Sequence, residues 1–173
     1  MNMEFLALDW IRAHLSSPLL DQAIVIITHL GDCGIVWLVL CAILIAVPRT
    51  RKTGVTILTA LMLEVFFCNL IIKPLMARPR PYQVRPDVAL LIAQPLSYSF
   101  PSGHTGLSFA AAFALHGRKS TFFLPMPDLA CLIAFSRVYL YVHYPSDVLA
   151  GAILGGALGE LARMPVDLWY RTR

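Results

Sequence analysis

Apolar residues along this chain are grouped in six blocks that are separated by short segments rich in charge, proline or glycine. The blocks cover residues 19–30, 35–47, 55–70, 107–115, 129–142 and 148–161. Lipid offers no hydrogen-bond partners to the backbone, so a segment that crosses a bilayer has to satisfy its own polar groups as a helix does. The pattern therefore predicts an all-α, polytopic membrane protein with six transmembrane helices.

Several of these blocks are shorter than the roughly 20 residues that a helix needs to cross the hydrocarbon core. We therefore expect the helices to continue into their polar flanks, to tilt little, or to cross a locally thin bilayer. The alternative is a soluble helical bundle, in which helices would satisfy the backbone equally well.

The segment before the first block has the spacing of an amphipathic helix. Phe5, Leu8, Ile11 and Leu15 recur at helical spacing, while polar residues occupy the rest of the turn. We expect residues 1–17 to form an interfacial helix on the cytoplasmic face; an early start of the first transmembrane helix is the alternative. Pro18 suits the first turn of a new helix.

Composition supports one membrane domain. Hydrophobic residues make up 58% of the 173 residues, whereas an average globular protein has roughly 45–50%. We expect a single membrane domain over residues 1–173, with the interfacial helix at 1–17, a six-helix core at 18–163 and an extracytoplasmic loop at 74–101. The net charge of +4 does not indicate a nucleic-acid partner, and the sequence carries no signal for an oligomeric state.

Basic residues predict the orientation of the helices. They follow the second, fourth and sixth blocks, at Arg49, Arg51, Lys52, Arg118, Lys119, Arg163, Arg171 and Arg173. Under the positive-inside rule these ends are cytoplasmic. A second group of cations then falls on the opposite, extracytoplasmic side, together with His104 and His143, and this second group requires an explanation.

The extracytoplasmic ends of the third and fourth helices have the chemistry of an anion site. Lys73 and Arg80 are separated by six residues, and Pro79 and Pro81 keep the intervening chain out of a continuous helix. At the next helix start, Ser102 is a good N-cap and Gly103 lets the backbone approach a ligand, so free amides and the helix dipole favour an anion. His104 stands in the same turn.

The end of the fifth helix adds a further cation and a candidate nucleophile. Arg137 presents a planar fork that matches two phosphate oxygens. Pro145 interrupts the helix, so that Asp147 can turn back toward His143. A carboxylate on one ring nitrogen fixes the imidazole tautomer and leaves the other nitrogen available for chemistry.

Together these residues resemble the three-part signature of the type 2 phosphatidic acid phosphatase superfamily, in its integral membrane branch. The matching segments are Lys73 to Pro81, the PSGH stretch at 101–104, and Ser136 and Arg137 with His143 and Asp147. The resemblance implies a metal-independent phosphatase without a cofactor. His143, oriented by Asp147, would attack phosphorus and form a phosphohistidine, and His104 would act as acid and then base. The resemblance also implies which residues bind the oxygens of the phosphate: Lys73, Arg80, Ser102, Gly103 and Arg137.

The substrate implied is a lipid phosphate reached from the bilayer of a bacterial cytoplasmic membrane, with the site on its extracytoplasmic face. Small bacterial members of the family suggest hydrolysis of undecaprenyl diphosphate to undecaprenyl phosphate. A phosphatidylglycerophosphate or phosphatidic acid phosphatase is the alternative within the family. A vanadate-dependent haloperoxidase and a non-catalytic lipid-phosphate carrier are alternatives of other classes. We expect residues 82–100 to form either a lid or a simple loop.

The remaining polar and small residues are expected to be structural. The four cysteines have no metal-ligand spacing and are interpreted as packing residues. Glycines at 151, 155 and 159 allow close helix packing in lipid. We expect structural roles for His29, Asp32 and Glu64, and an ion pair between Glu160 and Arg163.

Overall fold

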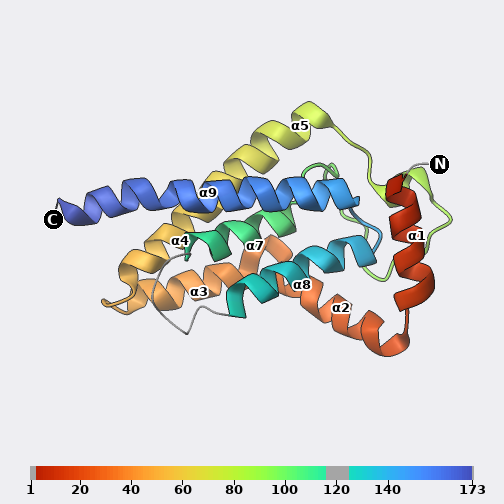
Figure 1. Ribbon diagram of the computed structural model, residues 1–173, viewed down its shortest axis with the longest axis horizontal. Coiled ribbons are helices and arrows are strands. Elements are labelled where there is room, and N and C mark those ends of the chain that lie inside the picture. The colour runs from red at the N-terminus through yellow and green to blue at the C-terminus, as the bar shows by residue number, and fades with distance from the viewer. Residues whose placement is uncertain (1–2, 116–124, 173) are drawn as a thin grey trace.

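The computed structural model describes residues 3–115 and 125–172, and its elements there are helices joined by turns (Figure 1). In chain order they are α1 (Met3–Leu15), α2 (Pro18–Leu30), the 3₁₀ helix η1 (Asp32–Gly34), α3 (Ile35–Ala46), α4 (Arg51–Glu64), the π-helix η2 (Val65–Ile72), α5 (Lys73–Met76), α6 (Pro81–Val84), α7 (Gly103–Ala114), α8 (Pro125–Tyr139) and α9 (Pro145–Arg171). The all-α prediction is confirmed for this part of the chain. Arg118 and Lys119, used above for orientation, lie outside the described residues.

Two helices are long and apolar enough to cross a membrane. They are the stretch 51–84, which contains α4, η2, α5 and α6, and the single helix α9. The pair formed by α2 and residues 32–46 provides a third candidate if it is one span. By contrast, α7 has 12 residues and α8 has 15, which corresponds to lengths of roughly 18 and 22 Å. The described helices thus provide two or three clear spans; six separate spans are not confirmed.

The first two apolar blocks do not form the expected pair of opposed spans. The axes of α2 and of residues 32–46 are bent by 46°, so the chain continues in the same general direction through the break (Figure 1). The physical reason lies in the intervening turn, where Cys33 and Gly34 have φ values of 51° and 67°. Two left-handed residues kink the chain here but do not reverse it.

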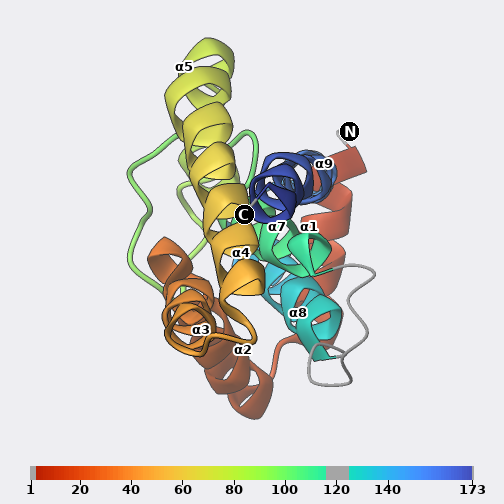
Figure 2. The same cartoon turned by 90° about the vertical axis from the view of Figure 1, so that its left-hand side faces the viewer.

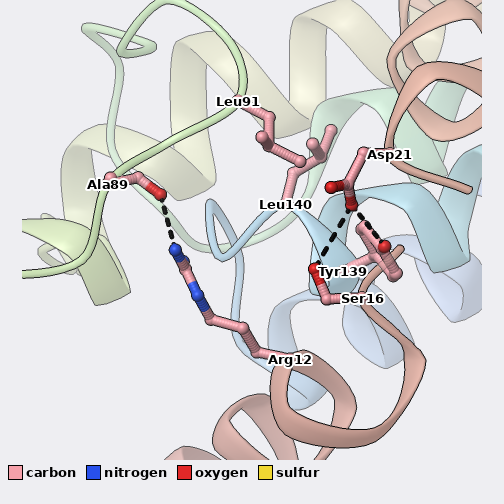
Figure 3. Close-up of a pocket in the computed structure, with 7 residues that line it drawn as sticks. All are labelled: Arg12, Ser16, Asp21, Ala89, Leu91, Tyr139 and Leu140. Atoms are coloured by element: carbon pink, nitrogen blue, oxygen red, sulfur yellow. Dashed lines mark hydrogen bonds between the residues drawn. The ribbon is translucent and has the colours of Figure 1, made fainter. Parts of the chain in front are cut away.

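The position expected for α1 was wrong as a consequence. α1 lies at the end of the bundle where α8 ends and α9 begins (Figure 1), and this is the end that carries the candidate phosphate residues. Asp9 accepts hydrogen bonds from Arg85 at 2.6 Å and from Tyr141 at 2.7 Å. Arg12 donates to the carbonyl of Ala89 at 3.0 Å (Figure 3). The helix is therefore not on the opposite face of the bundle.

The start of α2 is attached to the same end of the bundle. Ser17 caps α2, and its hydroxyl accepts a hydrogen bond from the backbone of Leu20 at 3.3 Å. Asp21 accepts a hydrogen bond of 2.5 Å from the hydroxyl of Tyr139, in the last turn of α8 (Figure 3). The predicted helix start at Pro18 is confirmed, as is the start of α9 at Pro145.

α7 is the central helix of the bundle, in contact with α4, α8 and α9 (Figure 2). The glycines of α9 allow its closest approach. A Cβ atom on Gly151 would lie 2.6 Å from the carbonyl oxygen of Ser102, and one on Gly159 would lie 2.5 Å from that of Ala110. Real Cβ atoms do not approach so closely, so the predicted packing role of this glycine stripe is confirmed.

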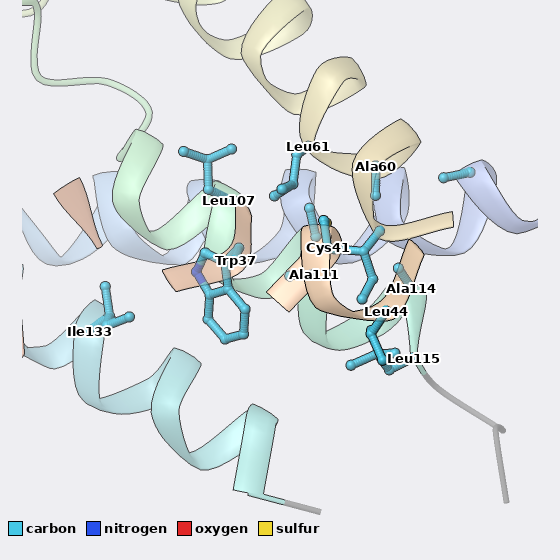
Figure 4. Packing of buried hydrophobic residues seen from close by; sticks show 13 residues of the cluster. Trp37, Cys41, Leu44, Ala60, Leu61, Leu107, Ala111, Ala114, Leu115 and Ile133 are labelled. Carbon is cyan, nitrogen blue, oxygen red and sulfur yellow. The ribbon is translucent and has the colours of Figure 1, made fainter. Parts of the chain in front are cut away.

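The apolar core lies between α3, α4, α7 and α8 (Figure 4). Trp37 is fully buried there and donates its indole N–H to Ser108 at 3.1 Å. Two cysteines, Cys41 and Cys68, are buried, whereas Cys33 and Cys131 are exposed. The interpretation of cysteines as packing residues therefore holds for the buried pair. The Glu160 and Arg163 side chains form the expected ion pair at 2.8 Å.

Candidate active site

Most of the residues that were expected to hold phosphate line one cavity of about 530 Å³. It lies among the α2–α3 turn, the end of η2, the segment 92–97, the start of α7 and the α8–α9 connection. Six of the eight predicted site residues contribute to its wall: Lys73, Arg80, Gly103, His104, Arg137 and His143. Ser102 and Asp147 are not among the lining residues. Residues from distant parts of the chain thus meet in a single pocket.

Arg80 is held in place from several directions. Its guanidinium donates to the carbonyl of Ser97 at 2.7 Å and to that of Val142 at 2.8 Å. The same side chain lies 3.0 Å from Nε2 of His143. The extended backbone of Arg80, directly before the new helix that begins at Pro81, positions this side chain. This fork is fixed before any anion binds.

Lys73 and Gly103 face each other across the pocket. The Lys73 ammonium is 3.4 Å from the hydroxyl of Ser97 and would lie 3.5 Å from a Cβ atom placed on Gly103. The helix continues through Lys73 to Met76, and it ends at Ala77, four residues after Lys73. Ser97 contacts both Lys73 and Arg80. It lies in none of the sequence motifs, so this contact was not predicted.

Arg137 enters the pocket from the last turn of α8 and is almost fully buried. It donates a short hydrogen bond to Thr28 of α2, while its Nε atom is buried without a hydrogen-bond partner. Unpaired buried donors are costly. A guanidinium N–H without an acceptor beside Arg80 and Lys73 favours an anion in this pocket.

His143 is almost fully enclosed, with an exposed fraction of 1%. Burial holds the pKa of His143 well below its ordinary value, and the charges of Arg80 and Arg137 act in the same direction. The imidazole is therefore neutral at pH 7. Since the Arg80 guanidinium can only donate, Nε2 is the unprotonated nitrogen and the proton is on Nδ1. A neutral ring with a free Nε2 lone pair is the nucleophilic form.

Asp147 lies behind His143, as expected, but it does not form the expected hydrogen bond. Its Oδ2 atom is 3.5 Å from Nδ1 of His143, and that ring nitrogen has no hydrogen-bond partner. Asp147 Oδ2 instead accepts from the hydroxyl of Ser99 at 2.5 Å and from the backbone of Tyr144 at 2.9 Å. The carboxylate is close enough to act on His143 electrostatically, and its orientation is set by other donors.

Arg78 is one of these donors. Its guanidinium binds Oδ1 of Asp147 at 2.6 Å and the hydroxyl of Ser146 at 2.8 Å. It also forms a short ion pair with Glu4 of α1 and lies 4.0 Å from the centre of the Tyr144 ring. Arg78 therefore connects α1 to the carboxylate behind His143.

Ser102 occupies the N-cap position of α7, but the prediction that its side chain caps the helix is wrong. Its hydroxyl is wholly buried and accepts a hydrogen bond from Thr105 at 3.0 Å. Its backbone N–H donates to the carbonyl of Asp147 at 3.0 Å. The residue joins α7 to α9, and its carbonyl oxygen lies close to Gly151.

His104 contacts a residue that was expected to be structural. Its Nε2 atom lies 2.9 Å from Oδ1 of Asp32, and Oδ2 of Asp32 lies 2.6 Å from Nδ1 of His29. His29 and Asp32 also line the cavity. The only sequence signal for this contact was a histidine and an aspartate in a turn at the same predicted membrane face as His104.

An apolar groove of about 380 Å³ adjoins the pocket. It lies between α3 on one side and α4 with η2 on the other, and Cys33 and Leu107 line both spaces. Its wall includes Leu38, Met62 and Phe66. A ligand with a charged head and an apolar tail could occupy both spaces at once.

The segment 92–97 forms a part of the pocket wall that the apolar groove does not share. Ile92, Gln94 and Pro95 line the cavity, and the hydroxyl of Tyr82 donates to the carbonyl of Pro95 at 2.7 Å. Among residues 3–115 and 125–172, no three His, Cys, Asp or Glu side chains are grouped as a metal site requires. The arrangement is a cationic pocket whose two candidate catalytic histidines, His104 and His143, come from different elements.

Comparisons with known proteins point to one family. A profile described as the PAP2 superfamily matches residues 53–167. The chain is 30% identical over 183 residues to undecaprenyl-diphosphatase BcrC of Bacillus subtilis, covering 99% of this chain and 91% of that protein. It is 34% identical over 129 residues to an undecaprenyl-diphosphatase of Sulfolobus acidocaldarius, covering 73% of this chain but only 62% of the relative. The crystal structure of Aquifex aeolicus LpxE superposes with a TM-score of 0.81 and 29% identity, over 94% of this chain and 95% of that one.

Proposed function

This chain belongs to the PAP2 superfamily, and from that premise we propose that it hydrolyses a lipid phosphate or diphosphate. The observation that carries the proposal is the single pocket that Lys73, Arg80 and Arg137 line together with His143, whose Nε2 lies 3.0 Å from the Arg80 guanidinium. Phosphoryl transfer depends on positioning and on neutralising the charge of the equatorial oxygens. Three buried cations beside a neutral imidazole supply both requirements.

In the first step, Nε2 of His143 attacks phosphorus in line. A bound phosphoryl group takes over the Arg80 donor that now faces this nitrogen, so the lone pair is released for attack. The N–P bond forms as the bond from phosphorus to the leaving oxygen breaks, which gives a phosphohistidine. His104 donates a proton to the leaving oxygen, and Asp147 stabilises the positive charge that develops on the His143 ring.

In the second step, water hydrolyses this intermediate. His104, now neutral, accepts a proton from water as the water oxygen attacks phosphorus and the N–P bond breaks. The products are inorganic phosphate and free His143, and His104 has regained its proton. The same imidazole serves as acid and then as base, so the cycle needs no external proton donor and, as we propose it, no metal ion.

We propose undecaprenyl diphosphate as the substrate, with undecaprenyl phosphate and phosphate as products, in the cytoplasmic membrane of a bacterium. Two relatives are named undecaprenyl-diphosphatases. The groove beside the pocket is apolar, has a volume of about 380 Å³, and meets the pocket at Cys33 and Leu107. A single prenyl chain fits such a groove more readily than the two acyl chains of a glycerophospholipid.

We also propose that the chain crosses the membrane five times, with α2 and α3 forming one broken pass. Arg49, Arg51, Arg163 and Arg171 would then face the cytoplasm, and α1 and the pocket would face outward. In intact cells, Met3→Cys in a cysteine-free background should react with a membrane-impermeant maleimide added outside, whereas Arg49→Cys should not. Labelling of position 49 alone would contradict this orientation.

The decisive experiment measures phosphate release by detergent-solubilised protein from a panel of lipids. The panel contains undecaprenyl diphosphate, undecaprenyl phosphate, phosphatidylglycerophosphate and phosphatidic acid. We expect turnover of undecaprenyl diphosphate to be fastest, to persist in EDTA and to be inhibited by vanadate. Faster turnover of a glycerophospholipid would overturn the choice of substrate, and loss of activity in EDTA would overturn the metal-independent mechanism.

A non-catalytic carrier is distinguished by the His143→Ala variant. A carrier would still move labelled lipid phosphate between leaflets of a vesicle, because the cations remain. The hydrolase instead loses phosphate release while its gel-filtration profile is unchanged.

A further inference from the structure

The turn between α2 and α3 forms a wall of the pocket although it lies outside the three motifs described above. His29, Asp32 and Cys33 all line the cavity. None of the three has a part in the reaction as proposed so far. The question is what this turn contributes to the chemistry on the other side of the pocket.

Asp32 is engaged through both of its carboxylate oxygens. Oδ1 lies 2.9 Å from Nε2 of His104 on α7, and Oδ2 lies 2.6 Å from Nδ1 of His29 on α2. Two partners on opposite oxygens prevent the carboxylate from rotating freely. The position of the His104 ring is therefore coupled to a residue 72 positions away in sequence.

The backbone of the turn brings Asp32 close to His104. Gly31 is buried, and a Cβ atom at this position would lie 2.9 Å from Cδ2 of His104 and 2.9 Å from Cγ2 of Ile133. Any side chain there would push the turn away from the imidazole. The left-handed conformation of Gly34 then returns the chain to α3 within 3.3 Å of the Leu107 side chain, measured from an added Cβ atom.

The charges of the pocket make such a carboxylate necessary. Lys73, Arg80 and Arg137 line the same cavity as His104, and nearby cations disfavour the protonated form of an imidazole. His104 nevertheless has to carry a proton to act as the acid. Asp32 is the carboxylate in contact with its ring, and an adjacent negative charge favours the imidazolium.

We propose that Asp32 is a positioning residue that holds His104 in its protonated form and directs the second ring nitrogen, Nδ1, toward the leaving oxygen. This inference rests on the proposed function. Nε2–H donates to Oδ1 of Asp32, and Nδ1–H is transferred to the leaving oxygen as its bond to phosphorus breaks. Asp32 itself neither gains nor loses a proton, and it does not touch the phosphoryl group.

The role predicts a dependence on the leaving group. A monophosphate releases an alcohol, which is a poor leaving group unless its oxygen is protonated. A diphosphate releases a phosphate monoester, whose pKa is about 6 and which can depart as an anion. Loss of Asp32 should therefore slow monophosphate cleavage much more than diphosphate cleavage, whereas a structural defect would slow both alike.

The test compares farnesyl monophosphate with farnesyl diphosphate, which share one tail, as substrates of the detergent-solubilised protein. The measured quantity is kcat/KM, because it reports the steps up to departure of the leaving group. For Asp32→Asn we expect a loss of about 10- to 100-fold on the monophosphate and less than about threefold on the diphosphate, since a positioned proton donor contributes on the order of 10²- to 10⁴-fold. Asp32→Glu should restore part of the loss.

Asp21→Asn is the matched control, because Asp21 is also a carboxylate of the α2 region but binds Tyr139 and not His104. We expect it to change the two kcat/KM values by the same factor. Inhibition by vanadate should be retained in Asp32→Asn within about twofold, since Asp32 does not bind the anion. Equal losses on both substrates, or weaker vanadate inhibition, would overturn the role of Asp32. Absence of hydrolysis by the wild-type protein would instead refute the proposed function.

Discussion

The two histidines of the pocket are supported by different parts of the chain. His143 is 1% exposed and stands before a fully buried carboxylate, Asp147. His104 keeps 24% of its side chain exposed and contacts Asp32, whose side chain is 51% exposed. His143 lies in the connection between α8 and α9, whereas His104 lies against the α2–α3 turn.

This difference fits the two tasks proposed for the rings. A nucleophile has to be neutral, and burial among cations keeps the imidazole of His143 neutral. An acid has to keep its proton near the same cations, which requires contact with a carboxylate and with water. The proposed roles therefore require opposite protonation states of two identical side chains, set by burial and by their neighbours.

The largest effect expected from breaking this comparison is at the nucleophile. His143→Ala should lower phosphate release from undecaprenyl diphosphate by about 10⁴-fold or more, because no other group can form the covalent intermediate. His104→Ala should lower it less on a diphosphate, whose leaving group can depart without a proton. Rates are measured at saturating substrate, with the melting temperature in detergent as the control for folding. Equal losses in both variants would show that the two histidines do not have separate roles.

The next effect concerns the support behind His143. Arg78→Ala removes the cation that binds Asp147 at 2.6 Å and leaves a buried carboxylate with one donor fewer. Breaking a buried ion pair costs about 3–5 kcal/mol, and since Arg78 is 26% exposed we expect about 3 kcal/mol or less of unfolding free energy.

Activity of Arg78→Ala should fall together with this stability, because Asp147 then loses its fixed position behind His143. Arg85→Ala is the control, since Arg85 pairs with the more exposed Asp9. Unfolding in a denaturing detergent measures the difference. An Arg78→Ala protein as stable as the Arg85→Ala protein would mean that the ion pair does not support Asp147.

Helix packing beneath the pocket gives a smaller effect. A Cβ atom on Gly155 would lie well inside the van der Waals contact distance to the Gly106 carbonyl oxygen. One on the adjacent Gly156 would lie 3.6 Å from the ring of Phe113. Overpacking typically costs about 1–3 kcal/mol, so Gly155→Ala should lower the melting temperature more than Gly156→Ala does. Equal melting temperatures would indicate that α7 and α9 can separate without cost.

The sequence predicted the nucleophile side of the site better than the acid side. The residues of this side lie near helix ends, and their spacing together with the positive-inside rule predicts that they lie on one face. They are Lys73, Arg80, Arg137 and His143. The partners of His104 lie in a turn 72 residues earlier. Nothing in the local pattern of that turn shows which distant side chain it will meet, because the contact depends on tertiary packing.

The fold was predicted in kind but not in its path near α1 and α2. Hydropathy located the apolar blocks at 19–30 and 35–47, but it does not distinguish a kink from a reversal in the four residues between them. The left-handed backbone of Cys33 and Gly34 makes that choice. The prediction that α1 and the candidate phosphate residues lie on opposite faces depended on the reversal, and it was wrong for that reason. Pairings such as Asp9 with Arg85 and Tyr141 were hidden from the sequence as a result.

The attachment of α1 provides the smallest effect and a pH dependence. The hydrogen bond from Tyr141, together with Arg85, holds the pKa of Asp9 below its ordinary value of 3.8. A carboxylate whose pKa is lower in the folded state stabilises that state fully above the unfolded pKa, and the contribution is lost as the pH falls through the folded value. Asp9 is 47% exposed on its side chain, so the contribution is that of a surface pair, about 1 kcal/mol or less.

Asp9→Asn should therefore lower the melting temperature at pH 7 by no more than about 4 °C, and the difference from wild type should shrink as the pH falls below 3.8 and through the lower pKa of the folded state. Asp87→Asn, which replaces a carboxylate in the segment after α6, is the control and should leave the melting temperature at pH 7 close to that of the wild type. Because Tyr141 is two residues before His143, a loosened α1 should also shift activity slightly at acid pH. If the melting temperatures of Asp9→Asn and the wild type stay apart at low pH, then the ionised Asp9 carboxylate does not hold α1 on the bundle. The enclosure of His143 then does not depend on that helix.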